Sequence, residues 1–119
     1  MSIISLCLGL VGGIFVSGIL LPVMAQVTSD GTTNTVVNEN DSNFTIVDGI
    51  EKGNNLFYSF SSFTIPTNTS ATFDLVNTPN ITTIFSRVAG GNVSNIDGLI
   101  STVNSNSLVS LFLGCYASS

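Results

Sequence analysis

The sequence predicts an all-β fold. After residue 25, strand-forming Val, Ile, Thr and Phe alternate with polar residues, and Asn, Gly and Ser interrupt them at short intervals. No segment of useful length in this part of the chain shows apolar residues at helical spacing. Strand signals near residues 84, 99 and 110 recur about every dozen positions, which is typical of a sandwich or of the successive faces of a solenoid.

The chain begins with a separate apolar segment. A run from Ile3 to Leu21 contains Ser and Gly but no charge, and Pro22 then ends a helical segment. Val23-Met24-Ala25 places small or branched residues at the spacing of a signal-peptide cleavage site. We therefore predict an N-terminal signal helix within residues 1–25, with cleavage after Ala25. A single membrane anchor is the alternative, which the Gly residues of the run and the missing flanking charges disfavour.

The next segment is polar and begins the β region. Residues 26–43 are rich in Asn, with a short β-branched core at Thr35-Val36-Val37 and a turn signal at Asp30-Gly31. Phe44-Thr45-Ile46 alternates apolar and polar residues, which indicates a short half-buried strand. Asp48-Gly49 then predicts a turn.

The aromatic segment that follows has two apolar phases. Leu56, Tyr58 and Phe60 share one phase of an alternating strand, whereas Phe63 and Ile65 share the opposite phase. A strand of period two cannot bury both sets on one face without a slip. We therefore predict a bulge or corner at Ser61-Ser62. A strand buried on both faces is the alternative.

Four further apolar segments complete the chain. They are Ala71 to Leu75, Ile81 to Val88, Leu99 to Val103, and Leu108 to Leu113. The residues between them are mostly Asn, Gly, Ser, Thr and Pro, and Asn and Gly tolerate the left-handed backbone of solenoid corners. We expect a coil of roughly 20 residues, a few coils in all, and an exposed strand edge on the last coil.

Composition excludes some functions and disfavours others. The net charge is −5, with Lys52 and Arg87 as the two cations, so a basic footprint for nucleic acid is excluded. The chain has no His, and three of its seven acids precede Gly in turns, so we expect no enzyme, no catalytic residues and no cofactor. The segment 38–43 has oxygen ligands at alternate positions but lacks the Gly of a calcium loop, so we expect no metal.

Two long segments carry a resemblance to a known family. The first runs from Asn55 to Pro66 and is rich in Phe; the second, Ile84 to Ile100, reads Ile-x-x-Arg-Val-x-Gly-Gly-x-x-Ser-x-Ile-x-Gly-x-Ile. Together with the Thr-, Val- and Asn-rich strand 33–38, they resemble the amino-terminal domain of filamentous-haemagglutinin-type exoproteins. That family is exported across the Gram-negative outer membrane by two-partner secretion. The resemblance covers residues 26–103.

The resemblance implies a fold and a role. The implied fold is the start of a right-handed parallel β-helix with antiparallel capping strands, left incomplete. The implied role is an N-terminal secretion and β-helix-nucleating domain of a haemagglutinin- or adhesin-like exoprotein, secreted or held at the cell surface after passage through the periplasm. Its partner would be the periplasmic part of an outer-membrane two-partner secretion pore, and β-augmentation is a plausible mode of docking. The candidate partner-recognition residues are Asn55, Phe57, Phe60, Phe63, Arg87, Gly90 and Gly91.

The last segment departs from the family pattern. Residues 104–119 lack the Asn-Pro-Asn-Gly-Ile element that the family continues with, which predicts a divergent tail or a frameshift. A host or cell-surface ligand would then be bound through a missing downstream region. The alternative is a small, self-sufficient, β-rich surface or adhesive protein. Arg87 we interpret as a structural residue that caps a coil or pairs with an acid, and Phe57, Phe60, Phe63 and Phe73 as core.

Overall fold

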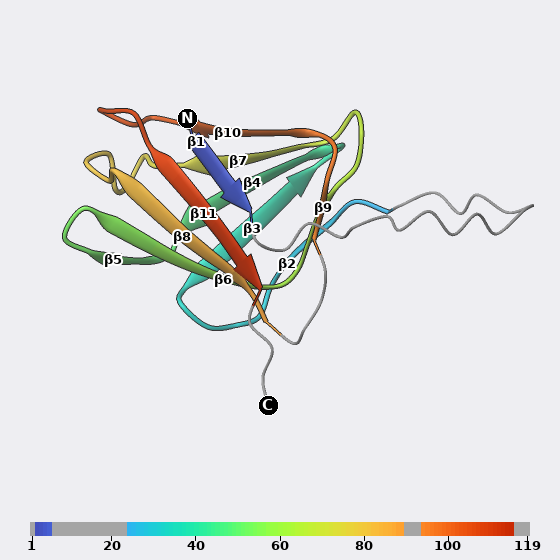
Figure 1. Ribbon diagram of the computed structural model, residues 1–119, viewed down its shortest axis with the longest axis horizontal. Helices are drawn as coiled ribbons and strands as arrows, with labels where there is room; N and C mark the ends of the chain where they lie inside the picture. Colours follow the sequence, from blue (N-terminus) through green and yellow to red (C-terminus); the bar gives the residue numbers. More distant parts are fainter. Residues whose placement is uncertain (1, 6–23, 90–93, 116–119) are drawn as a thin grey trace, which may run out of the picture.

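The computed structural model describes residues 2–5, 24–89 and 94–115, and these contain strands and turns but no helix (Figure 1). One sheet holds β1 (Ser2–Ser5), β2 (Gln26–Ser29), β5 (Ile50–Lys52), β6 (Asn55–Ile65), β8 (Thr83–Val88), β9 (Asn95–Ile96) and β11 (Ser110–Cys115). The other holds β3 (Thr35–Asn40), β4 (Asn43–Asp48), β7 (Ser70–Asp74) and β10 (Leu99–Val103). The predicted all-β fold is confirmed.

The predicted signal helix lies mostly outside the described residues. At Ser2–Ser5, where the structure does describe this segment, the chain forms strand β1. β1 pairs in parallel with β11, whose outer edge would otherwise be open. Among the described residues, no helix has the length and apolarity of a membrane span.

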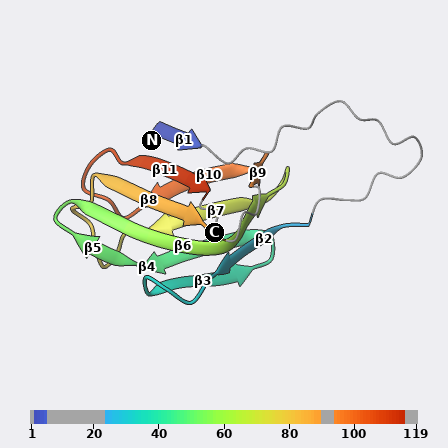
Figure 2. The ribbon, with the colours of Figure 1, turned by 60° about the horizontal axis from the view of Figure 1, so that its bottom comes forward.

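The chain alternates between the two sheets. β4, β7 and β10 pair in parallel in one sheet, and β6, β8 and β11 pair in parallel in the other, so the sheets form two facing layers (Figure 2). Each coil of the solenoid therefore contributes one strand to each layer. The strand spacing of about a dozen positions corresponds to half a coil.

Each coil is longer than the roughly 20 residues that the sequence suggested. In one sheet the register partner of Leu56 is Ile84, and the partner of Ile84 in the following coil is Leu111. In the opposite sheet the partner of Phe44 is Ala71. The expected coil was therefore too short, because residues outside the strands add to the length of each coil, such as the eight between β7 and β8.

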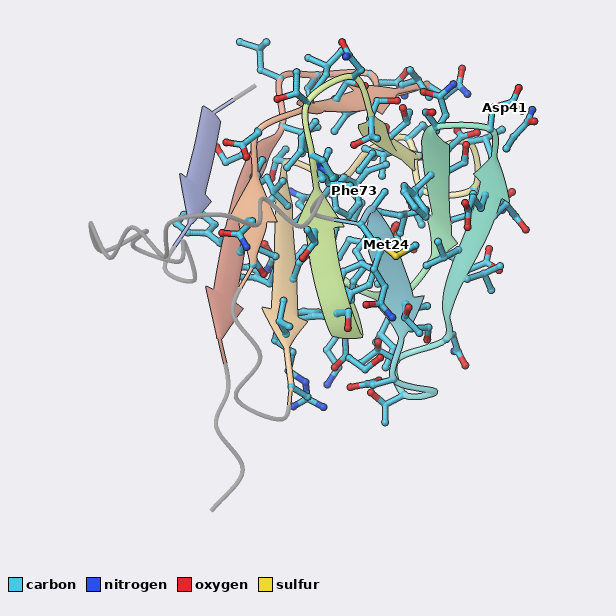
Figure 3. The ribbon with its side chains drawn as sticks, turned by 90° about the vertical axis from the view of Figure 1, so that its right-hand side faces the viewer. Met24, Asp41 and Phe73 are labelled. Atoms are coloured by element: carbon cyan, nitrogen blue, oxygen red, sulfur yellow. The ribbon has the colours of Figure 1, made fainter. Side chains whose placement is uncertain are left out.

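Antiparallel strands flank the first coil. β3 and β4 form a hairpin, and β2 and β5 both pair antiparallel with β6. Asp41 lies at the turn of the β3–β4 hairpin (Figure 3). Its φ is positive, at 54°. The predicted combination of a parallel stack with antiparallel strands at its start is therefore present.

The core lies between the two layers. The buried apolar side chains are Val27, Phe44, Ile46, Leu56, Tyr58, Phe60, Phe63, Ile65, Ala71, Phe73, Leu75, Ile81, Ile84, Val88, Ile100, Val109, Leu111 and Leu113. Phe73 lies among the side chains between the sheets (Figure 3) and is within ring-stacking distance of Tyr58 and Phe63, with centroids 5.3 and 6.4 Å away. At the optimal geometry such ring pairs add about 0.5–1.5 kcal/mol each beyond their buried area.

The predicted bulge in β6 is confirmed. Thr28 pairs with Ser62 but Ser29 pairs with Phe60, so Ser61 is the extra residue opposite β2. The slip reverses the phase of the strand, and Phe60 and Phe63 are both fully buried as a result. It lies where β6 leaves β8, whose last partner is Phe60, and turns toward β9.

Polar residues line the corners of successive coils, as the Asn and Gly pattern predicted. The Asn77 side-chain amide donates to Asp48 at 3.3 Å, and the Asn104 amide donates to Asp74 at 2.8 Å. Asp48 and Asn104 have positive φ angles of 65° and 60°, a conformation that Asn and Asp tolerate better than other non-Gly residues. Each of these bonds joins one coil to the next.

Gly98 fills a corner where no side chain fits. A Cβ there would meet the Thr69 carbonyl oxygen, and it would lie 2.6 Å from the Pro66 carbonyl oxygen. The Gly98 N–H also donates to the Ile65 carbonyl at 2.9 Å, which fixes the backbone at this distance. The Gly of the family pattern therefore has a steric cause.

We predict that Gly98→Ala lowers the free energy of unfolding by about 1–3 kcal/mol, because backbone atoms must move apart. Gly114→Ala is the matched control, since a Cβ at Gly114 meets nothing within 4 Å. Urea denaturation of both variants measures the difference. Equal stabilities would contradict the steric role of Gly98.

Tyr58 carries a buried hydroxyl without a partner. Its side chain is 2% exposed, and within the described part of the chain nothing hydrogen-bonds its oxygen. Burial raises the pKa of Tyr58 far above its ordinary value, and the negative charges of Asp48 and Asp74 raise it further. The phenol therefore stays neutral, and its desolvation is uncompensated.

We predict that Tyr58→Phe stabilises the protein by about 1 kcal/mol, since it removes an unsatisfied polar group and keeps the ring. The melting temperature should rise by roughly 4–8 °C. Tyr58→Leu, which also removes the ring contacts with Phe60 and Phe73, should lower it. A fall in melting temperature for Tyr58→Phe would show that the hydroxyl has a partner.

Candidate partner-recognition site

Three phenylalanine rings stack on the outer face of the first sheet. Phe57 of β6, Phe85 of β8 and Phe112 of β11 are register partners on adjacent strands. Both adjacent ring pairs have centroids 5.3 Å apart and planes 14° from parallel. We call these three residues the aromatic ladder. The residue before each ring is fully buried, so strand alternation places the ladder on the outside.

A shallow groove runs along the ladder. It has a volume of about 460 Å³, and its lining includes the three rings, Thr33 and Arg87. Phe85 is 38% exposed and Phe112 is 36% exposed, so the rings are partly open to solvent. Gly114 also lines the groove, and its missing side chain leaves open space there. The surface is thus apolar, with one cation at its border.

The cation belongs to a polar cluster that joins three strands and a loop. The Arg87 Nε–H donates to the Ser59 hydroxyl oxygen at 2.7 Å, and the Ser59 hydroxyl donates to the Asp30 carboxylate. The Thr35 hydroxyl oxygen accepts from the Ser59 backbone N–H at 3.1 Å. The cluster thereby ties the β2–β3 connection and β3 to β6 and β8. The interpretation of Arg87 as a structural residue fits these bonds.

The Asp30 carboxylate is held in its charged form. Partial burial alone would raise the pKa of Asp30, but the hydrogen bonds from Ser59 and Thr32 and the nearby Arg87 charge lower it below its ordinary value. Hydrogen bonds to the charged form of an acid always act in this direction. The charged carboxylate therefore helps to hold the loop against β6.

The candidate residues of the sequence are dispersed in the fold. Asn55 begins β6 and is half-buried, Phe57 lies on the aromatic ladder, and Arg87 borders the groove. Phe60 and Phe63 are fully buried, so a partner reaches their side chains only in a chain that has not folded. Gly90 and Gly91 lie outside the described residues.

The sequence interpretation of the Phe cluster was right for all but one of its members. Phe60, Phe63 and Phe73 are core, but Phe57 faces outward because it lies one position out of phase with its buried neighbours in β6. Phe85 and Phe112 were not recognised as members of the surface. Phe85 and Phe112 occupy the register positions of Phe57 in the next two coils. With the register known, their place on the outer face would have followed from that of Phe57.

The face offers chemistry for binding. It presents stacked rings, a groove floor without a side chain at Gly114, and the Arg87 guanidinium already engaged by Ser59. No group of three or more metal-ligating side chains occurs among the described residues. The arrangement suits an apolar segment of a partner, with a polar contact at one border.

We predict that Asp30→Asn weakens the acid dependence of stability. Because the folded-state pKa lies below the unfolded value of about 3.9, the charged form of Asp30 stabilises the fold above that pH, and this stability is lost as the pH falls through the folded pKa. The wild type should therefore melt above the variant near pH 6, and the gap should narrow toward about pH 2.5. Thermal melts across this pH range measure the difference in melting temperature. A difference that does not change with pH would contradict a stabilising charge on Asp30. Asp41→Asn, at an exposed hairpin turn, is the control.

A model of the TPS secretion domain family matches residues 25–114. No curated protein and no solved structure matches the chain. The matched range includes every strand from β2 to β10 and most of β11, and it contains all the candidate recognition residues. The resemblance seen in the sequence is confirmed. The chain therefore belongs to the TPS secretion domain family, whose members direct a secreted exoprotein to an outer-membrane transporter of the two-partner secretion type.

Proposed function

We propose that this domain is the N-terminal secretion and β-helix-nucleating module of a haemagglutinin- or adhesin-like exoprotein, and that it has no catalytic activity of its own. The observation that carries the proposal is the parallel stack, in which β6, β8 and β11 repeat one register from coil to coil. A stack of this kind can be extended coil by coil along its axis.

We propose further that the transporter binds the domain in the periplasm, before it folds. The segment from Asn55 to Pro66 supports this proposal, because most of its large apolar side chains are buried in the folded core. Leu56, Phe60, Phe63 and Ile65 are each 0% exposed. In an extended chain, Leu56 and Phe60 lie on one face of the strand and Phe63 and Ile65 lie on the other. Either pair would then be free to enter pockets beside a sheet edge, which is the geometry of β-augmentation.

Folding outside the cell would then make export one-directional. Burial of each of these large apolar side chains stabilises the folded state by about 1.5–3 kcal/mol, and several of them are buried together. Once buried, they are no longer available to the transporter. The same residues would therefore bind the transporter first, in the extended chain, and form the core afterwards, in the folded domain.

A second function is supported by a different observation. The described residues enclose a continuous core of buried apolar side chains, and β1 covers the edge of β11. Such a core fits a small self-sufficient surface or adhesive protein. Cooperative, reversible melting of the full chain as a monomer would favour this function, whereas a broad, non-cooperative transition would count against it.

Export by a transporter of the two-partner secretion type tests the first proposal. Asn55→Ala should abolish transporter-dependent appearance of the chain in the medium, and replacement of Arg87 by Ala should do the same, since each residue lies in one of the two segments that carry the family resemblance, 55–66 and 84–100. Asn54→Ala and Lys52→Ala are matched controls, because Asn54 acts through its backbone carbonyl and Lys52 is exposed.

The melting temperature of each purified variant separates recognition from folding. A variant that loses export but keeps its melting temperature has lost recognition. Unchanged export of Asn55→Ala and of Arg87→Ala would overturn the assignment of these residues. Equal loss of export in the controls would overturn it as well, because the effect would then not be specific.

A further inference from the structure

Two outward-facing columns of side chains lie next to each other on β6, β8 and β11 (Figure 1). One is the aromatic ladder. The other lies two positions further along each strand and consists of the register partners Ser59, Arg87 and Gly114. Residues two apart in a strand share a face of the sheet. A column of rings therefore runs beside a column in which one long cation stands between two small residues.

The second column leaves a hollow at Gly114. A Cβ there would meet nothing within 4 Å, and Gly114 lines the same groove as Phe112 and Arg87. The groove volume of about 460 Å³ lies within the range of roughly 300–1,000 Å³ that is usual for small-molecule sites. Such sites are mostly apolar and hold a few polar groups that orient the ligand. The groove has this composition.

The ladder offers ring edges to a ligand. Phe85 stands between Phe57 and Phe112, with its plane 14° from parallel to each, so both of its faces are covered. Its side chain is nevertheless 38% exposed, and the exposed part is the ring edge. A flat base or ring stacks on an aromatic face, whereas an aliphatic chain needs only apolar contact. The ladder therefore favours an aliphatic ligand.

The groove gives a peptide backbone few hydrogen-bonding partners. β8 pairs with both β6 and β11, so its backbone groups are used within the sheet. The Thr33 hydroxyl donates to the Thr32 carbonyl at 2.7 Å and shares a second hydrogen bond with the Thr35 hydroxyl at 2.8 Å. Polar groups laid along the rings would lose water without replacement, which is unfavourable. An acyl chain carries no polar group along its length, so it avoids this cost.

The charge at the border selects the head group of such a chain. Arg87 is cationic, and no acid is among the described residues that line the groove. The Asp30 carboxylate accepts from the Ser59 hydroxyl and is not part of this lining. Ring edges carry the positive end of the aromatic quadrupole, so they also favour an anion over a cation. The net charge of −5 opposes an anion only weakly, because salt screens charges beyond about 8 Å at physiological ionic strength.

We propose that this groove binds a free fatty acid, with the acyl chain along the edges of the aromatic ladder and the carboxylate at Arg87. The guanidinium acts through its charge, and its bond to the Ser59 hydroxyl holds it at the border of the groove. The site belongs to the folded domain and contains no residue of the predicted leader. It goes beyond the proposed secretion function and does not rest on it.

Calorimetric titration of the purified full chain with dodecanoate, below the concentration at which it forms micelles, tests the proposal. Dodecanoate should bind with a stoichiometry of one. Dodecylammonium has the same chain and the opposite charge, and it should bind at least about tenfold more weakly because Arg87 repels it. This comparison uses the wild type alone, so it does not depend on the folding of any variant.

Gly114→Leu locates the site. The new side chain enters the open space above the strand, so it should weaken dodecanoate binding at least about tenfold while the melting temperature stays at or above that of the wild type. Leu99→Ser is the control, because Leu99 is 64% exposed on β10 in the other sheet. It removes apolar surface away from the groove and should keep the affinity of the wild type. All three proteins carry the same apolar leader, so any binding to the leader is common to them.

Four results would overturn the proposal. They are no binding of dodecanoate, equal affinities for dodecanoate and dodecylammonium, unchanged binding to Gly114→Leu, and an equal loss of binding in Leu99→Ser. Equal affinities would show apolar adsorption without a role for Arg87, and unchanged binding to Gly114→Leu would show that the ligand lies elsewhere. The titrations involve no transporter, so their failure is distinguishable from failure of the export proposal.

Discussion

The repeated register of parallel strands is the constraint on which the rest of the structure depends. Each coil places one strand in each of two facing sheets, and the inward residues of both sheets share one core. A change of one residue in the register would turn the inward column outward. The aliphatic column through Leu56, Ile84 and Leu111 is fully buried, whereas the adjacent column, the aromatic ladder, is partly exposed.

The connections between strands are under the same constraint. The corner at Gly98 brings two backbone segments so close that no Cβ fits, and side-chain amides at other corners bind the acid or amide one coil earlier. The Asp30–Ser59–Arg87 cluster holds the β2–β3 connection, in the antiparallel start of the domain, against β6 and β8. Core packing determines which residues point inward, and polar contacts of this kind hold each corner where the chain passes from one sheet to the other.

Local patterns in the sequence were enough to predict much of this fold, but not its register or all of its site. Alternation identified the strands, and the clash of phases between Phe60 and Phe63 located the bulge at Ser61. The long-range register depends on the length and path of the connections, which alternation does not specify. Because the expected coil was too short, the sequence did not show that the rings of the aromatic ladder are register partners. Ser59 and Asp30 were not found, because a serine inside an aromatic strand gives no signal until its carboxylate partner is known. The strand β1 was not expected either, since an apolar leader favours a helix when it is considered alone.

The repeated register is tested most directly by double-mutant cycles along the aromatic ladder. Alanine replacements at Phe57 and Phe85, and at Phe85 and Phe112, should each show a coupling of about 0.5–1.5 kcal/mol in the free energy of unfolding. The pair Phe57 and Phe112, separated by one strand, should show a coupling near zero. Coupling between Phe57 and Phe112 without coupling to Phe85 would contradict the parallel order of the three strands.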